Sequence, residues 1–212
     1  MEYIIRNEMP TDNRAVEELT KMAFWNVNAP GCDEHYLVHM MRGHPDFIPE
    51  LSLVMFADGA LIGNIMYTKA RLVDDAGREK TILTFGPVSI QPSFQRQGNG
   101  KRLIEHSFGK AAQMGYEAVV IFGNPANYVG LGFKSCKKYD VSLEGKLFPA
   151  ALLVKELKPG SLVGQSWRYQ ESDAYHIDAG EAARFDAGFE FLAKELKPSQ
   201  EEFFILSRAR IH

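Results

Sequence analysis

The spacing of apolar residues predicts an N-terminal strand followed by two helices. Residues 3–6 have the pattern of a short strand, and Thr11 or Asp12 can cap the helix that follows. Apolar residues then recur on one helical face, at Ala15, Val16, Leu19, Met22 and Ala23. A second helix is expected over residues 34–42, after a loop that contains Pro30-Gly31.

The middle of the chain has the pattern of a sheet. Apolar runs at residues 51–57 and 61–70 flank Asp58-Gly59, a pair typical of a tight hairpin. The run 81–90 predicts another strand, which Gly86-Pro87 interrupts. Because proline lacks a backbone donor and glycine often marks a bulge, we expect this strand to be distorted in its middle.

The second half continues with both kinds of element. A helix is expected from Leu103 to Gly115, and the apolar run 118–122 predicts a strand buried on both faces. A further strand is expected within residues 148–157. Helical spacing returns at residues 182–192, and the apolar run 203–206 is interpreted as a late strand. The whole pattern favours a mixed α/β or α+β sheet.

Composition excludes several classes of protein. The 212 residues are 45% hydrophobic and 24% charged, as in globular domains, and a formal net charge of -3 argues against broad nucleic-acid binding. Two cysteines without a CxxC pair predict neither a disulfide framework nor a structural zinc site. The chain lacks an apolar leader and any stretch of the roughly 20 apolar residues that a membrane helix needs. We therefore expect a cytoplasmic protein without a membrane partner.

Residues 88–108 (VSIQPSFQRQGNGKRLIEHSF) combine a strand, a loop with two glycines and the start of a helix. Free N–H groups at a helix N-terminus bind anions, and Gly98 and Gly100 let a ligand approach the backbone. Arg96, Lys101 and Arg102 add positive charge, so a phosphate or pyrophosphate is the expected ligand. The loop lacks GxxxxGK[ST] and a full GxGxxG, which argues against Walker-type and dinucleotide sites. From the glycines alone, a plain turn with a solvated basic helix start is an equal alternative.

A second segment favours the phosphate site. Residues 121–133 (IFGNPANYVGLGF) follow the buried strand and end in Leu131-Gly132-Phe133. The motif Gln95-x-x-Gly98-x-Gly100 and, further along, the motif Tyr128-x-x-x-Gly132-Phe133 together resemble the GNAT superfamily of N-acetyltransferases.

The resemblance covers roughly residues 3–160 and includes a central hairpin at Asp58-Gly59. Three further segments are similar to a bacterial subgroup of largely unassigned acetyltransferases: residues 123–128, 148–150 and 156–160. The resemblance implies a GNAT-like α+β fold, with a twisted, mostly antiparallel central sheet, two splayed parallel strands and flanking helices. Residues 1–160 would form the acetyltransferase domain, and residues 161–212 a C-terminal extension that packs on it or on a partner.

The resemblance also implies a binding site for acetyl-coenzyme A (acetyl-CoA) where the strands at 81–90 and 117–122 splay apart. The break at Gly86-Pro87 would free backbone groups for the pantetheine arm; a bulge without a ligand is the alternative. The backbone groups concerned belong to Val88, Ser89 and Ile90. The pyrophosphate would lie over Gln95, Arg96, Gln97, Gly98, Asn99, Gly100 and Lys101. Asn127 would contact the same ligand, whereas Asn124 would shape the turn.

Tyr128 is the expected general acid, because it matches the tyrosine of the family. A phenol stays protonated at neutral pH and can give its proton to a departing thiolate. A backbone N–H near Val88 would polarise the thioester carbonyl. The alternative for Tyr128 is a tyrosine that only packs in the core. No general base is assigned: His44, Asp46 and Glu50 could relay a proton through water, and the alternative, which we favour, is that each is a plain surface residue.

Other reactive residues predict no further chemistry. Cys32 and Cys136 show no pairing with a histidine, so covalent catalysis is disfavoured. His35 and His39 lie four residues apart on a predicted helix but lack a third ligand, so no metal is expected.

The expected function is acetyl-CoA-dependent N-acetyltransfer to a primary amine, by direct transfer in a ternary complex. The acceptor would be a small amine or a peptide, and the region between Trp25 and Pro49 would line its site. One alternative is a GNAT-like module that senses acyl-CoA without turnover. In another, the extension forms a homodimer interface or a lid over the acceptor site.

Overall fold

The computed structural model describes residues 2–212, which form one mixed sheet of nine strands. The main path is β1–β2–β3–β4–β5–β8–β6, while β9 pairs with β3 and β7. The strands are β1 Tyr3–Asn7, β2 Leu53–Ala57, β3 Ala60–Asp74, β4 Glu79–Ile90, β5 Ala118–Phe122, β6 Lys134–Ser135, β7 Val141–Ser142, β8 Leu152–Glu156 and β9 Trp167–Gln170. Of the strand pairings in this part of the chain, only β4–β5 and β7–β9 are parallel. The mostly antiparallel sheet with flanking helices is confirmed.

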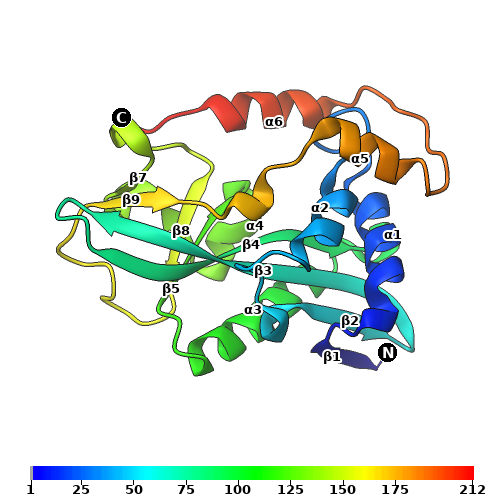
Figure 1. Cartoon of the computed structure of the whole chain (residues 1–212), viewed down its shortest axis with the longest axis horizontal. Coiled ribbons are helices and arrows are strands. Elements are labelled where there is room, and N and C mark those ends of the chain that lie inside the picture. The colour runs from blue at the N-terminus through cyan, green and yellow to red at the C-terminus, as the bar shows by residue number, and fades with distance from the viewer. Residues whose placement is uncertain (1) are drawn as a thin grey trace.

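Helices cover both faces of the sheet (Figure 1). They are α1 Asn13–Phe24, α2 Glu34–Met41, α3 Asn99–Gln113, α4 Pro125–Tyr128, α5 Ala179–Asp186 and α6 Pro198–Arg208. One core lies between the sheet and α3, where Leu83 of β4 packs with Leu103 and Phe108. On the opposite face, Val54 of β2 packs against Val16 of α1. Residues next to one another along a strand therefore enter different cores, as the alternation of strand side chains requires.

Residues 161–212 lie on the same sheet. Strand β9 pairs with the end of β3, and α5 packs beside α2 through Phe185, whose ring centroid lies 4.5 Å from that of His39. Helix α6 lies across the top of the molecule in Figure 1, between α5 and the region of β7 and β9. Its two ends are tied to separate loops, by Ser199 Oγ donating to Val27 O (2.8 Å) and Ala150 N donating to Ala209 O (2.9 Å). The strand predicted at 203–206 is wrong, because these residues belong to α6, which begins with Pro198.

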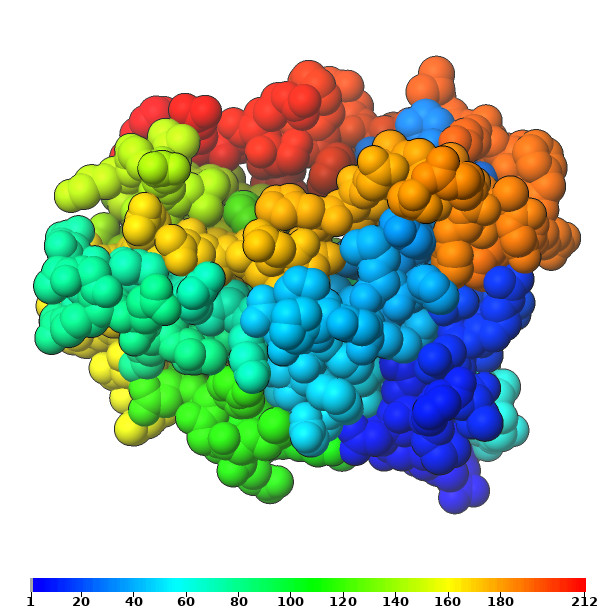
Figure 2. All heavy atoms as spheres, in the orientation of Figure 1, coloured from blue at the N-terminus to red at the C-terminus, as the bar shows by residue number. Residues whose placement is uncertain are grey.

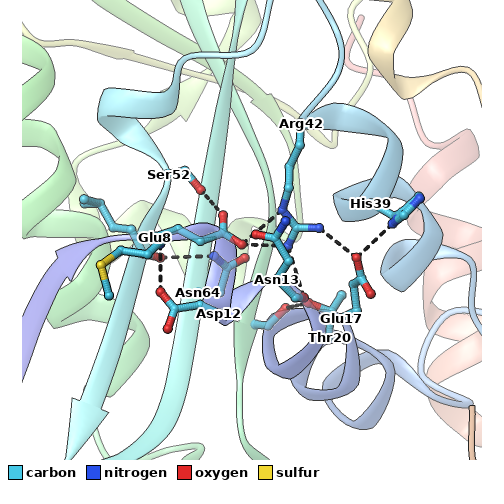
Figure 3. Close-up of polar contacts among 12 residues, drawn as sticks. Glu8, Asp12, Asn13, Glu17, Thr20, His39, Arg42, Ser52 and Asn64 are labelled. Atoms are coloured by element: carbon cyan, nitrogen blue, oxygen red, sulfur yellow. Dashed lines mark hydrogen bonds and ion pairs between the residues drawn. The ribbon is translucent and has the colours of Figure 1, made fainter.

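A buried ionic network fastens α1 and α2 to the first strands (Figure 3). The guanidinium of Arg42 donates to Glu8 Oε1 (2.6 Å) and to Glu17 Oε1 (2.8 Å). Ser52 Oγ donates to the other oxygen of Glu8 (2.5 Å), and His39 Nδ1 lies 2.9 Å from Glu17 Oε1. The Glu8 and Glu17 side chains are only 5% and 7% exposed, so their charges depend on Arg42 for compensation.

We predict that Arg42→Ala lowers the free energy of unfolding by about 3–5 kcal/mol, because it leaves two buried carboxylates without their cation. Chemical denaturation measures this loss. As a control, Arg184→Ala breaks the exposed Arg184–Glu181 pair and should leave the free energy of unfolding almost unchanged. Equal stability of Arg42→Ala and the wild type would contradict the role given to the network.

Candidate functional site

The parallel strands β4 and β5 pair at one position only, Leu83 opposite Val119. On its other edge, β4 pairs with β3 through Val88–Ile65 and Phe85–Tyr67. Two residues of β4, Gly86 and Pro87, therefore stand opposite a single residue of β3, which is a β-bulge. The distortion predicted at Gly86-Pro87 is confirmed. Beyond it, the edge of β4 that faces β5 has no strand partner among the described residues.

The three β4 residues predicted to bind a pantetheine arm differ in what they can offer. Ser89 is fully buried, its Oγ lies 2.9 Å from Thr20 Oγ1 of α1, and its backbone is paired with Asn64 of β3, so neither its side chain nor its backbone faces the unpaired edge. The carbonyl of Ile90 already accepts a hydrogen bond from Gln95 Nε2 (2.9 Å). Val88 is partly exposed beside the bulge. Contact of these backbone groups with a ligand stays a prediction.

The loop between β4 and α3 presents free backbone donors. Arg96 and Gly98 have left-handed conformations (φ of 59° and 82°), and such backbone concavities bind anions. The first backbone bond of α3 runs from Arg102 N to Gly98 O (3.0 Å). Within residues 2–212, the N–H groups of Asn99, Gly100 and Lys101 have no acceptor. The partial positive charge of the helix N-terminus adds to this donor set.

Side-chain amides shape this loop rather than point to a ligand. Gln97 Nε2 donates to Ser93 O (2.8 Å), and Asn99 Nδ2 donates to Phe94 O (3.0 Å). Together with the bond from Gln95 to Ile90, these contacts fold the loop back on the preceding turn. The amide groups of the three side chains are thus engaged, and the donors left for an anion are those of the backbone.

The basic residues near the loop differ in whether other side chains already pair with their charge. Lys101 Nζ lies 3.8 Å from Glu105 Oε1, one turn further along the exposed side of α3. The guanidinium of Arg102 stacks over the ring of Tyr3, 4.1 Å from its centroid. Arg96 is exposed and has no ion pair among residues 2–212. Arg96 and Lys101 can add charge to an anion site, whereas Arg102 also helps to pack the N-terminal strand.

Tyr128 lies where β4 and β5 separate, on the α3 side of the sheet. Its ring packs against Phe85 and Phe133, with centroid distances of 5.9 and 5.7 Å. A Cβ on Gly123 would lie 2.5 Å from the Tyr128 ring, so glycine is required there. Burial raises the pKa of Tyr128 to about 12, and its hydroxyl has no hydrogen-bond partner in the described chain. A protonated phenol is therefore available to a ligand.

Helix α4, which carries Tyr128, begins at a capped turn. Asn124 Oδ1 accepts a hydrogen bond from Ala126 N (3.0 Å), which confirms the turn-forming role predicted for Asn124. Asn127 is exposed on the same helix, and its contact with a ligand stays a prediction.

Sequence reasoning missed contributions from the C-terminal extension. The Tyr175 hydroxyl donates to Gly86 O (3.3 Å), so the extension reaches the bulge of β4. Asp46, one of the candidate bases, accepts a hydrogen bond from Ser172 Oγ (2.7 Å) and holds the extension in place. No local signal identifies these contacts, because the partners are separated by 89 and 126 positions in the sequence.

A second polar cluster corrects an expectation about cysteine. Cys32 Sγ lies 3.6 Å from His35 Nδ1, and His35 Nε2 lies 3.0 Å from Asp186 Oδ1, so a cysteine–histidine pair does exist. Burial, which is the main cause, raises the pKa of Cys32 to about 12, so the thiol is protonated and a poor nucleophile. Across residues 2–212, no group of three or more His, Cys, Asp or Glu side chains is arranged so that it could hold a metal ion.

Comparisons with known proteins agree with this geometry. The acetyltransferase (GNAT) family model matches residues 18–133, more than half of the chain, and the chain therefore belongs to this family. It is 27% identical over 162 residues to YhbS of Escherichia coli K12, an uncharacterized N-acetyltransferase, a match that spans 76% of this chain and 91% of YhbS.

Solved structures show the same fold. The crystal structure of Escherichia coli YhbS in complex with CoA has a TM-score of 0.70 and 23% identity, and covers 82% of this chain and 92% of that one. A Brucella melitensis GNAT acetyltransferase in complex with acetyl-CoA has a TM-score of 0.64 and 24% identity, over 82% of this chain and 99% of that one. None of the helices within residues 2–212 has both the length and the apolar character needed to cross a membrane.

We predict that Gly98→Ala weakens the binding of acetyl-CoA by roughly tenfold, because a Cβ at this left-handed position distorts the donor loop. Gly77→Ala is a matched control, since Gly77 has nearly the same φ (80° against 82°) and lies in the β3–β4 turn. Both substitutions should cost about 1–2 kcal/mol of stability. Isothermal titration then separates them, and equal affinities in the two variants would contradict a diphosphate site at the loop.

Proposed function

We propose that this N-acetyltransferase takes its acetyl group from acetyl-CoA and transfers it directly to a primary amine in a ternary complex. The proposal is carried by the gap that opens between β4 and β5 beyond the single pair Leu83–Val119, which we call the wedge. The wedge leads to the unpaired N–H groups at the start of α3. The CoA and acetyl-CoA complexes of the two similar structures support this choice of donor.

The chain can hold acetyl-CoA mainly through its backbone. The N–H groups of Asn99, Gly100 and Lys101 would bind the pyrophosphate, with the loop from Gln95 to Gly98 around it. The unpaired edge of β4 would bind the pantetheine arm in the manner of an added strand. This arrangement brings the thioester to the bulge at Gly86-Pro87, close to Tyr128.

The residues at the bulge supply the groups that acyl transfer needs. The N–H near Val88 would stabilise negative charge on the thioester oxygen. The neutral amine attacks the carbonyl carbon, a C–N bond forms and the C–S bond breaks. The Tyr128 hydroxyl then gives its proton to the thiolate, and the tyrosine regains a proton from the amine through solvent.

Two measurements on the wild type test the proposed function. Isothermal titration should detect acetyl-CoA binding, and a thiol-release assay with a panel of polyamines, aminoglycosides, amino acids and peptides should reveal an acceptor. Mass spectrometry of the product confirms a gain of one acetyl group on nitrogen. Failure to bind acetyl-CoA at millimolar concentration would refute the donor assignment, and binding without transfer would favour an acyl-CoA sensor.

Tyr128→Phe should reduce kcat by about 10²-fold or more, because general-acid catalysis typically contributes that much. Its acetyl-CoA affinity should stay unchanged, since the ring packing is retained. Because burial raises the pKa of Tyr128 to about 12, the wild-type phenol stays protonated through the alkaline range. We therefore expect kcat not to fall between pH 8 and 10, and a fall in this range that Tyr128→Phe abolishes would contradict the raised pKa. A wild-type kcat in Tyr128→Phe would contradict the general-acid role.

A further inference from the structure

On the sheet face opposite α3, the C-terminal extension adds aromatic residues next to the wedge. Tyr169 of β9 is only 4% exposed, and its ring lies 6.1 Å from that of Phe122, the last residue of β5. Its hydroxyl is buried and has no hydrogen-bond partner among residues 2–212. The Tyr175 hydroxyl meets the bulge of β4 at Gly86 O. A buried, unpartnered phenol beside the reaction site needs an explanation, because such groups are costly.

Glu171 lies between these two tyrosines in the sequence. It is exposed at the surface, and it makes no ion pair or hydrogen bond in the described part of the chain. Protein atoms around its carboxyl group nevertheless raise its pKa by desolvation, while His176 and the nearby Tyr169 hydroxyl partly oppose the rise. The Tyr169 pKa is in turn raised by burial and by the Glu171 charge. Tyr169 belongs to β9 and Glu171 directly follows its last residue, Gln170, so the two side chains take alternate strand positions and project to the same side of the chain.

Both sides of Glu171 are held in place. Before it, Gln170 pairs with Arg71 in the sheet. After it, Ser172 Oγ donates to Asp46 Oδ2 (2.7 Å) and accepts a hydrogen bond from Ala174 N (3.2 Å). Of the basic residues nearest in the chain, Arg168 makes no ion pair with Glu171 among the described residues, and His176 has Asp173 Oδ1 at 3.4 Å. An unpaired carboxylate on a fixed backbone is suited to bind a cationic ligand.

The surroundings are accessible and partly apolar. Phe122 is 44% exposed although its neighbours in β5 are buried. Figure 2 shows a hollow between α6 and the segment around residues 170–180. The exposed ring of Phe122, which packs on the buried Tyr169, offers an apolar wall beside the acidic group, and aromatic faces also attract cations.

We propose that Glu171, Tyr169 and Phe122 form the acceptor subsite, in which the carboxylate pairs with the ammonium group of a primary amine attached to an aromatic body. The buried Tyr169 hydroxyl orients the carboxylate, and the exposed ring of Phe122 packs against the aromatic body. This inference rests on the proposed function, since it places the acceptor on the face opposite the α3 donor site.

The test compares Glu171→Gln with Glu144→Gln, which removes an exposed, unpaired carboxylate from the loop before β8. Isothermal titration of the CoA-saturated protein uses 2-phenylethylamine and tyramine as probes, with 2-phenylethanol as a neutral analogue. Glu171→Gln should weaken amine binding about tenfold or more and leave the alcohol unaffected. Glu144→Gln should match the wild type, and all three proteins should bind acetyl-CoA with affinities within about twofold.

A second variant, Tyr169→Phe, keeps the ring and removes the unpartnered hydroxyl, and it should weaken amine binding several-fold. Equal amine affinity in the wild type and Glu171→Gln, or no binding of either amine to the wild type, would overturn the proposed subsite. The titrations are repeated without CoA, so failure of the proposed function has a separate signature. Acetyl-CoA would then not bind or react, while amine binding would still depend on Glu171.

Discussion

The site depends on one feature of the backbone, the separation of β4 from β5 after a single paired position. An extra residue in β4 at Gly86-Pro87 shifts its register against β3, and its opposite edge is left without a strand beyond Leu83. Unpaired backbone groups are unfavourable unless water or a ligand satisfies them. The protein surrounds this gap with the rings of Phe85, Tyr128 and Phe133, which keep it open on the α3 side.

The anion site next to this gap is formed by geometry more than by charge. The amides of Gln95, Gln97 and Asn99 each donate to a backbone carbonyl, and the backbone N–H groups of the loop stay free. A protein with a formal net charge of -3 can therefore present a concentrated positive potential at one helix start. Side-chain charge contributes less, because the guanidinium of Arg102 packs on the ring of Tyr3.

The sequence predicted most of the fold. Apolar periodicity located the longer strands and helices up to residue 157 but not the two-residue strands β6 and β7. The glycines of the β4–α3 loop and Tyr128, which the sequence singled out, lie on the α3 side of the sheet, and their role stays a prediction. Periodicity failed at 203–206, where four consecutive apolar residues carry no period, and Pro198 is the better signal because it starts a helix. It also could not show that β9, a strand of four residues, pairs with β3, since the partners lie almost 100 positions apart. Tyr169 comes to lie against Phe122 of β5 only through that long-range pairing.

The two sides of the wedge use different kinds of group, and this difference bears on specificity. The α3 side offers backbone N–H groups and one phenol, that of Tyr128. Side chains of the β4–α3 loop can therefore change without loss of the backbone N–H groups that would bind the pyrophosphate. On the opposite side, the extension adds Tyr169 next to Phe122 of β5, and it is anchored by the Ser172–Asp46 bond and by the ion pair between Lys21 and Asp186 (2.6 Å). Because these anchors lie outside the donor loop, substitutions in the extension can alter the choice of amine while the acetyl-CoA site is preserved. A chain of this design can keep one donor and acquire different acceptors through changes in its last fifty or so residues.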